Sequence, residues 1–308
     1  MWEAQERQNG RQVAIKKIFD AFSHPSDARR TEFELKVLQE CTTNPHIITL
    51  IDSCLSLSKR DCYLVLEFME FNLHTAILHG VIAPHDRGFI MHQVVLGLLQ
   101  LHQLGVAHCD LTPSSVLLDK QCRVALSGLS SVQPFTNSSR SKDCLLATDD
   151  GADESVPSFS FSTSPRSYSP PEWLLGGSTI AASADVWSLG CVFWEMLHGT
   201  VLFPGLSTIH QLSLILGVLG MPSPNDVESI SSQYTEEILR AVNAFIDKEL
   251  SSSYLSVNVS SNPLDSDARD LLFKCVCFSP NKRISCEELI NHPYLTMHKS
   301  SQKKSKEI

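Results

Sequence analysis

The amino-acid sequence predicts an α+β fold with two lobes, a small β-rich N-terminal lobe and a large helical C-terminal lobe. Short β-branched runs flank one helical stretch before Glu70, and long helical periods take over from Asp86. With 308 residues, 43% of them hydrophobic and 19% charged, the chain can bury one large core or two moderate ones. We therefore expect one domain over residues 1–298, with the first lobe ending at about 69 and the second beginning at about 72.

Three segments predict the N-terminal lobe. The runs Gln12–Phe19 (QVAIKKIF) and Asp61–Met69 (DCYLVLEFM) are rich in β-branched and aromatic residues, which is typical of strands. Between them, Asp27–Glu40 repeats apolar residues at helical spacing. Asp27 is a suitable N-cap, because its side chain can accept a hydrogen bond from an N–H group of the first helical turn. The order is therefore strand, helix, strand.

Two long helices predict the C-terminal lobe. The first begins after Asp86, places Ile90 and Val94 on one face, and stops at Gly105, which suits the left-handed end of a helix. The second, Ala182–Gly199, is apolar around its whole circumference. A helix of that kind belongs in the middle of a lobe rather than on its surface.

Two segments lack periodicity. Residues 131–165 are dense in Ser, Thr, Asp and Gly, which predicts a long mobile loop. Residues 299–308 (KSSQKKSKEI) predict a disordered, solvated tail, although its lysines also leave a nuclear-localisation signal open.

Composition excludes several partners. The formal net charge of −9 argues against a general affinity for nucleic acid, which needs a surplus of Lys and Arg. No apolar run reaches the roughly 18 to 20 residues of a membrane span, and the polar N-terminus is no signal peptide. We therefore expect an intracellular, cytoplasmic protein, with the nucleus left open.

Three charged residues suggest a chemistry. Lys16 lies on an early strand, Glu34 on the next helix, and Asp110 in a loop (HCDLTPSS) after a long helix. In this order and spacing they resemble a protein kinase. The resemblance implies that the lysine holds the α and β phosphates of ATP, that the glutamate orients it, and that the aspartate accepts the proton of the substrate hydroxyl.

Longer stretches narrow the resemblance. The segments VAIKKIFDAFSHPSDARRTEFELKVLQE, YLVLEFMEFNL, LFPGLSTIHQLSLIL and FSPNKRISCEELINHPYL are similar to mitogen-activated protein kinases, most of all to the atypical branch called mitogen-activated protein kinase 15. The resemblance implies a buried ion pair between Glu172 and Arg283, and an Asp185 that braces the catalytic loop. It also places Arg166 and Tyr168 in a segment that contacts substrate.

The departures from the family fall on the chemistry. Where the catalytic loop of the family has Arg, Lys and Asn around the aspartate, this chain has Cys109, Thr112 and Ser115. The Asp that carries Mg²⁺ in the family has no counterpart, because Leu126 and Ser127 either replace it and the following Phe or mark a two-residue deletion. A hydroxyl is a poor ligand for Mg²⁺, so we doubt that Mg²⁺ binds.

The nucleotide site is expected to be altered as well. The resemblance places Leu66 at the gatekeeper position and Glu67 and Met69 in the hinge that receives adenine, so weak and metal-independent binding of ATP stays open. The Gly-rich phosphate loop of the family would lie before Trp2, so the N-terminal lobe is expected to be truncated, unless the natural start lies upstream. The phosphorylated triplet of the family corresponds to residues 160–162, Ser-Phe-Ser.

Two functions remain open on the sequence. The first is a pseudokinase or severely impaired kinase that acts by binding signalling proteins or an active kinase relative. The second is an active ATP-dependent Ser/Thr kinase with Asp110 as base and Lys16 on the phosphates. Asp110 could instead brace its loop, and the pair of Lys16 and Glu34 could be a plain salt bridge between strand and helix.

Overall fold

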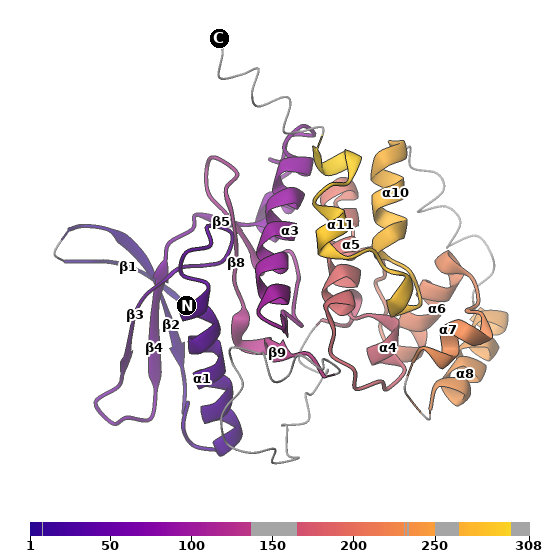
Figure 1. Cartoon of the computed structure of the whole chain (residues 1–308), viewed down its shortest axis with the longest axis horizontal. Helices are drawn as coiled ribbons and strands as arrows, with labels where there is room; N and C mark the ends of the chain where they lie inside the picture. The colour runs from indigo at the N-terminus through magenta and orange to yellow at the C-terminus, as the bar shows by residue number, and fades with distance from the viewer. Residues whose placement is uncertain (8, 137–164, 231, 233, 250–264, 297–308) are drawn as a thin grey trace, which may run out of the picture.

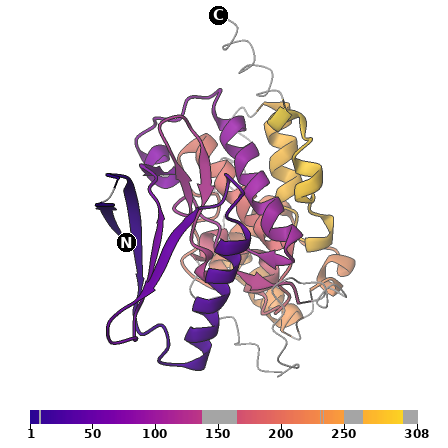
Figure 2. The ribbon, with the colours of Figure 1, turned by 60° about the vertical axis from the view of Figure 1, so that its left-hand side comes forward.

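The computed structural model describes residues 1–7, 9–136, 165–230, 232, 234–249 and 265–296. A sheet and helix α1 (Pro25–Glu40) form one lobe, and the remaining helices form the other (Figure 1). Helix α1 stands between the sheet and the helical lobe in both ribbon views (Figure 2). The predicted α+β fold with two lobes is therefore confirmed.

The N-terminal lobe is built on an antiparallel sheet with the strand order β1-β2-β4-β3. Its strands are β1 (Trp2–Gln5), β2 (Gln12–Ile18), β3 (Leu50–Leu55) and β4 (Cys62–Glu67). In β4 the side chains of Cys62, Leu64 and Leu66 are buried and alternate with half-buried neighbours. This alternation is what a sheet with one covered face requires. The two strands predicted from the sequence are both present.

Helix α1 begins two residues earlier than predicted, and the proposed N-cap, Asp27, is wrong. The cap is His24, whose side chain makes no capping bond, and Pro25 occupies the first helical turn. Proline suits that place because it has no N–H group to satisfy and its φ already fits a helix. Asp27 lies inside the first turn instead, where its carboxylate is stabilised by the positive end of the helix dipole.

The segment after α1 is hydrogen-bonded to the C-terminal lobe. The N–H of Ile48 donates to the carbonyl of Leu126 at 2.9 Å, and the N–H of Leu126 donates to the carbonyl of His46 at 2.9 Å. Gly97 permits this approach, because a Cβ atom at that position would lie only 2.7 Å from the carbonyl oxygen of His46. The lobes therefore meet through backbone bonds, and the contact demands a glycine on the facing helix.

The C-terminal lobe opens with helix α3 (Arg87–Gln103) and a set of short elements. These are β5 (Phe71–Asn72), α2 (Leu73–Leu78), β6 (Val106–Ala107), β7 (Val116–Leu118), β8 (Val124–Leu126) and β9 (Gln133–Pro134). The short strands pair as β5-β7-β8 and as β6-β9. In α3, Ile90 and Val94 are fully buried, and Gly105 follows the helix with φ of 79°, as the sequence predicts.

Helix α5 (Ala182–His198) forms the centre of the lobe. Most of its residues are buried, among them Trp187 and Phe193, and Gly199 ends it with φ of 73°. This confirms the predicted core helix. The elements around it are α4 (Pro171–Leu174), α6 (Thr208–Leu219), α7 (Pro224–Glu228), α8 (Thr235–Glu249), α10 (Ser266–Cys275), α11 (Cys286–Leu289), and short 3-10 turns at Leu129–Ser131, Arg166–Tyr168 and Pro280–Lys282.

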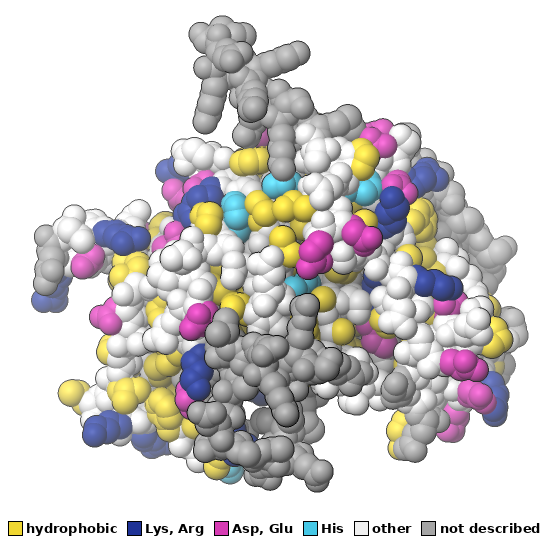
Figure 3. All heavy atoms as spheres, in the orientation of Figure 1, with side chains coloured by type: hydrophobic (Ala, Val, Ile, Leu, Met, Phe, Trp, Pro, Cys, Tyr) yellow, Lys and Arg dark blue, Asp and Glu magenta, His cyan; other side chains and the backbone are white. Residues whose placement is uncertain are grey.

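Some predictions fall outside the described residues. Of the predicted mobile loop 131–165, residues 137–164 lie outside them, including the triplet 160–162, whereas Gln133–Pro134 forms β9. The predicted tail 299–308 lies outside as well. Within the described part of the chain, every helix is too short or too polar to cross a membrane. Acidic and basic side chains lie scattered over the face of the molecule shown in Figure 3.

Candidate functional site

Lys16 and Glu34 form the ion pair that the sequence predicts. The Lys16 Nζ on β2 lies 2.5 Å from Oε1 of Glu34 on α1. The Glu34 side chain is 5% exposed and that of Lys16 is 23% exposed, so the ammonium group lies at the edge of the core. A partly exposed cation held in one place can contact an anionic ligand and its carboxylate partner together. Its role toward a nucleotide stays a prediction.

The loop after β6 is braced from below by a buried carboxylate. Asp185 accepts hydrogen bonds from the N–H of His108 at 2.8 Å and from the N–H of Cys109 at 2.9 Å. The Nε2 of His102 lies 2.8 Å from the same carboxylate. Cys109 adopts a left-handed φ of 63°, which costs energy for a residue with a Cβ atom, so these bonds hold a strained turn in place. The predicted bracing role of Asp185 is confirmed.

The charges of this brace support each other. Burial alone would raise the pKa of Asp185, but its bonds to His102 and His108 outweigh burial and lower the pKa. Burial would likewise lower the pKa of His102, but Cys286 and the bond to Asp185 raise it to about 10. Asp185 and His102 therefore form a charged pair inside the lobe, and the loop rests on it.

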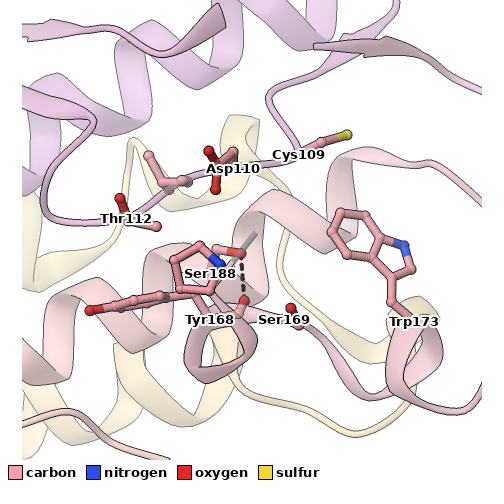
Figure 4. Close-up of a pocket in the computed structure, with 9 residues that line it drawn as sticks. Cys109, Asp110, Thr112, Tyr168, Ser169, Trp173 and Ser188 are labelled. Carbon is pink, nitrogen blue, oxygen red and sulfur yellow. Dashed lines mark hydrogen bonds between the residues drawn. The ribbon is translucent and has the colours of Figure 1, made fainter. Parts of the chain in front are cut away.

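Asp110 lines a small pocket between this loop and the segment that leads into α4. The pocket has a volume of about 10 Å³, enough for about one water molecule, and Tyr168, Ser169 and Ser188 form its opposite wall. Figure 4 shows Asp110 facing that wall, with the side chain of Cys109 pointing away from it. The Ser188 hydroxyl donates to the Tyr168 carbonyl at 2.8 Å, which fixes the wall. The pocket therefore presents a carboxylate and a rigid backbone to a small polar group.

Ser115, which takes the place of the family's metal-binding Asn, is engaged within its own loop. Its hydroxyl donates to the carbonyl of Thr112 at 2.9 Å and accepts the N–H of Thr112 at 3.0 Å. The side chain is buried, so these bonds are not exchanged with bulk water. The hydroxyl oxygen is thus directed toward the backbone of its own loop.

Ser127 stands beside Ser115 at the end of β8. Its N–H donates to the carbonyl of Ser115 at 2.8 Å and its hydroxyl donates to the same oxygen at 3.1 Å. The Nε2 of His108 lies 2.9 Å from the carbonyl oxygen of Ser127, and Gly128 follows in a left-handed conformation with φ of 80°. The backbone of this turn is therefore held by hydrogen bonds to the catalytic loop. Whether the sequence has a substitution or a deletion here, the turn next to the loop carries no carboxylate.

These residues do not fit a magnesium ion. Mg²⁺ prefers anionic oxygen in octahedral geometry, and in this fold it bridges the phosphates of ATP. The hydroxyls of Ser115 and Ser127, which donate to backbone carbonyls, are neutral and cannot supply the anionic oxygen that Mg²⁺ prefers. A site that depends on Mg²⁺ is therefore not supported by these side chains.

The predicted hinge residues lie where β4 leaves the N-terminal lobe. Leu66 and Met69 are buried in the core of that lobe. Glu67 accepts hydrogen bonds from the N–H and the hydroxyl of Thr49, at 3.1 and 3.2 Å. It also forms an ion pair with Arg123 at 2.9 Å, a contact that the sequence analysis missed. Arg123 lies 56 positions from Glu67, and no local pattern links them.

The frame below the site is also present. Arg283 donates to both oxygens of Glu172 at 2.7 and 2.6 Å, which confirms the predicted buried ion pair. The Tyr168 hydroxyl donates to Glu195 at 2.5 Å, and burial together with this bond raises the pKa of Tyr168. Arg166 lies at the surface, with its guanidinium 3.5 Å from the Leu206 carbonyl.

A β-rich lobe and a helical lobe that meet beside a braced aspartate loop define the architecture of protein kinases. The comparison with known families agrees, because the model of the protein kinase domain matches residues 1–295. The chain therefore belongs to the protein kinase family.

Its relatives are mitogen-activated protein kinases. Extracellular signal-regulated kinase 2 of Dictyostelium discoideum is 34% identical over 96% of this chain and 75% of its own length. Mitogen-activated protein kinase 15 of Caenorhabditis elegans is 36% identical over 96% of this chain and 60% of its own length. The rat protein of the same name is 35% identical over 96% of this chain and 51% of its own length. The chain thus spans between half and three quarters of these relatives.

Proposed function

We propose that this protein is a pseudokinase, or a severely impaired kinase, of the mitogen-activated type that acts in signalling through protein–protein interaction. The observation that carries the proposal is the loss of both metal-ligand side chains, because Ser115 stands where the family has Asn and the turn at residues 126–128 carries no carboxylate. The hydroxyls nearest to these positions, on Ser115 and Ser127, are neutral, and each donates to a backbone carbonyl, at 2.9 and 3.1 Å, whereas an active kinase needs a carboxylate and an amide there. The scaffold around them, including the brace of Asp185, is intact.

The expected loss of rate is large. Removal of one preorganised electrostatic contact costs about 10² to 10³ in rate. Two missing metal ligands, together with Thr112 in place of the family's Lys, therefore remove roughly 10⁴ or more, since such effects are not additive. An ordinary kinase turns over at roughly 1 to 100 per second, so almost no phosphoryl transfer is expected.

Weak nucleotide binding without a metal is part of the proposal. The ion pair of Lys16 and Glu34 offers a positioned ammonium group for a phosphate, and Leu66 and Met69 supply apolar walls near the hinge. Adenine recognition needs main-chain groups and an apolar slot rather than a metal. ATP would then stabilise the fold without being consumed.

The helical lobe is the proposed interaction module. Two large apolar side chains of this lobe are available to a partner, because Leu206, before α6, is 87% exposed and Tyr234, before α8, is 54% exposed. We propose signalling proteins or an active kinase relative as partners and the interior of the cell, chiefly the cytoplasm, as the place of action. The signalling role is supported by the names of the relatives, and the place of action is proposed from the sequence alone.

An active Ser/Thr kinase is the second candidate. It is favoured by Asp110, which lines the pocket, and by the pair of Lys16 and Glu34 on the other lobe. In this candidate Asp110 accepts the substrate proton and Lys16 holds the phosphates, with metal ligands from outside the residues described above.

A phosphotransfer assay separates the two candidates. The protein is incubated with labelled ATP, Mg²⁺ or Mn²⁺ and a general protein substrate, beside the Asp110→Ala variant. Glu236→Ala is the matched control, because Glu236 is an exposed carboxylate far in sequence from the loop. We expect no incorporation above background in any of the three. Incorporation that is retained by the control and abolished by Asp110→Ala would establish the active kinase.

A thermal-shift titration tests nucleotide binding by itself. ATP at ten times its Kd should add about 1.4 kcal/mol of stability, which raises Tm by about 2 °C for a chain of this size. The shift should be the same with and without Mg²⁺ and should be lost in Lys16→Ala. No shift in the unmodified protein would remove nucleotide binding from the proposal, and a shift that requires Mg²⁺ would contradict a metal-free site.

A further inference from the structure

Arg123, just before β8 in the C-terminal lobe, reaches across to the hinge. Its guanidinium group donates to Glu67 Oε2 at 2.9 Å and to the sulfur of Met69 at 3.1 Å. On its own lobe, the Nε of Arg123 donates to Asp119 at 3.1 Å. One side chain is therefore anchored in the helical lobe and bonded to two residues at the exit of β4.

Glu67 extends the connection to the segment after α1. Its second oxygen, Oε1, accepts the N–H of Thr49 at 3.1 Å and the Thr49 hydroxyl at 3.2 Å. The N–H of Glu67 in turn donates to the carbonyl of Thr49 at 3.0 Å. The two oxygens of the Glu67 carboxylate are thus bonded to different lobes, Oε1 to Thr49 in the N-terminal lobe and Oε2 to Arg123 in the C-terminal lobe. We call Thr49, Glu67 and Arg123 the clasp.

The clasp is more buried than an ordinary surface ion pair. The side chain of Glu67 is 13% exposed and that of Asp119 is 18% exposed, while Arg123 is 37% exposed. Burial alone would lower the pKa of Arg123, but Glu67 and Asp119 outweigh it and raise the pKa. Charge-assisted bonds in such surroundings are stronger than those of exposed pairs, which often contribute nothing measurable.

The position of the clasp gives it a mechanical consequence. Proteins built from two lobes open and close by changes in backbone angles at a few hinge residues, and kinases are among them. Here the chain passes from one lobe to the other through Glu67–Asn72, and the clasp bonds the first residue of that passage to both sides. Movement at the hinge would have to break the bonds to Thr49 or to Arg123.

We propose that the clasp of Thr49, Glu67 and Arg123 restricts movement between the two lobes at the hinge. The restriction is a property of the fold and goes beyond the proposed pseudokinase function, because it requires neither catalysis nor a bound nucleotide. A module held in one shape presents one constant surface to its partners.

Amide hydrogen exchange of the nucleotide-free protein tests the proposal. The variants are Arg123→Ala, Glu67→Gln and both together. Glu67→Gln keeps an oxygen for the N–H of Thr49 but loses the ion pair. Arg60→Ala is the matched control, since Arg60 pairs with Asp20 within the N-terminal lobe, with side chains 69% and 53% exposed. The readout is the exchange rate of peptides that cover the hinge, relative to peptides from α5.

Each single variant should accelerate exchange at the hinge about tenfold, the change expected when one charge-assisted bond is lost, and leave α5 unchanged. The double variant should be no faster than the single ones, because both substitutions remove the same interaction. Arg60→Ala should not change the hinge. The proposal is overturned if Arg123→Ala leaves hinge exchange unchanged, if hinge and α5 accelerate by the same factor, or if the two substitutions act additively.

Discussion

Replacement of Glu172 by Ala leaves a buried guanidinium group without its carboxylate. The Arg283 side chain is fully buried and that of Glu172 is 7% exposed, and two bonds of 2.7 and 2.6 Å join them. Loss of one partner of a buried pair costs about 3–5 kcal/mol, because the remaining charge stays out of water. The expected effect of Glu172→Ala therefore lies in this range before other contacts are considered.

The remaining contacts of Arg283 reduce the cost. The guanidinium also donates to the carbonyls of Cys277 at 2.9 Å, Ser183 at 2.9 Å and Phe278 at 3.1 Å, and it lies 5.1 Å from the ring centre of Trp187. These groups still stabilise the positive charge when the carboxylate is gone. We therefore expect the lower part of the range, a loss of about 3–4 kcal/mol in the free energy of unfolding.

Urea unfolding followed by circular dichroism measures this loss. Glu236→Ala is the control, because its bond to Arg240 at 3.3 Å joins side chains that are 78% and 79% exposed. The control should change stability by less than about 0.5 kcal/mol. A loss below about 1 kcal/mol for Glu172→Ala would refute the reasoning, since it would mean that the backbone carbonyls alone are sufficient for the buried charge.

Three further predictions concern the frame of the site. The pair of Asp185, whose pKa is lowered, and His102, whose pKa is raised to about 10, stabilises the fold at neutral pH. Its contribution should be lost as pH falls below 3.8, where Asp185 becomes protonated, and also as pH rises from 6.5 through about 10, where His102 loses its proton. When the free energy of unfolding is measured against pH, the decline on the alkaline side should disappear in His102→Asn. Gly97→Ala should destabilise by about 1–3 kcal/mol in urea unfolding, because its new Cβ would lie 2.7 Å from a backbone oxygen; an unchanged midpoint would show that the lobes separate easily at this contact. Tyr168→Phe should cost about 1–3 kcal/mol in the same assay, since Glu195 is buried and loses a donor at 2.5 Å; a neutral result would mean that another group replaces the hydroxyl.

Elements set by local chemistry were predicted well. Gly105 and Gly199 mark the ends of α3 and α5 because each follows an apolar helical run and adopts a left-handed φ, of 79° and 73°. Asp27 failed as a cap for an equally local reason, since Pro25 allows the helix to start earlier. Helices and strands can therefore be predicted from the sequence where the conformation of a segment depends on its own residues.

Contacts between distant segments were predicted only where a family motif names them. The pairs of Lys16 with Glu34 and of Glu172 with Arg283 follow from the resemblance, and the structure contains both. Arg123 belongs to no such motif, and its bond to Glu67 depends on how two lobes pack. Residue identity alone likewise cannot show which acceptors a serine hydroxyl will choose, because that choice depends on the closed conformation of the loop.

The loss of both metal-ligand side chains, at Ser115 and in the turn at residues 126–128, also bears on whether the chemistry could be restored by design. Ser115→Asn would remove the bonds that close the loop on Thr112, and Leu126→Asp would place a charge at a fully buried position of β8. Each change alone loses about 1 kcal/mol or more of loop stability and gains no activity, because the other metal ligand is still missing. Each single substitution therefore lowers the stability of the fold without raising the rate of phosphoryl transfer. A repaired enzyme would have to acquire both ligands in one step, together with a loop rebuilt to hold them apart.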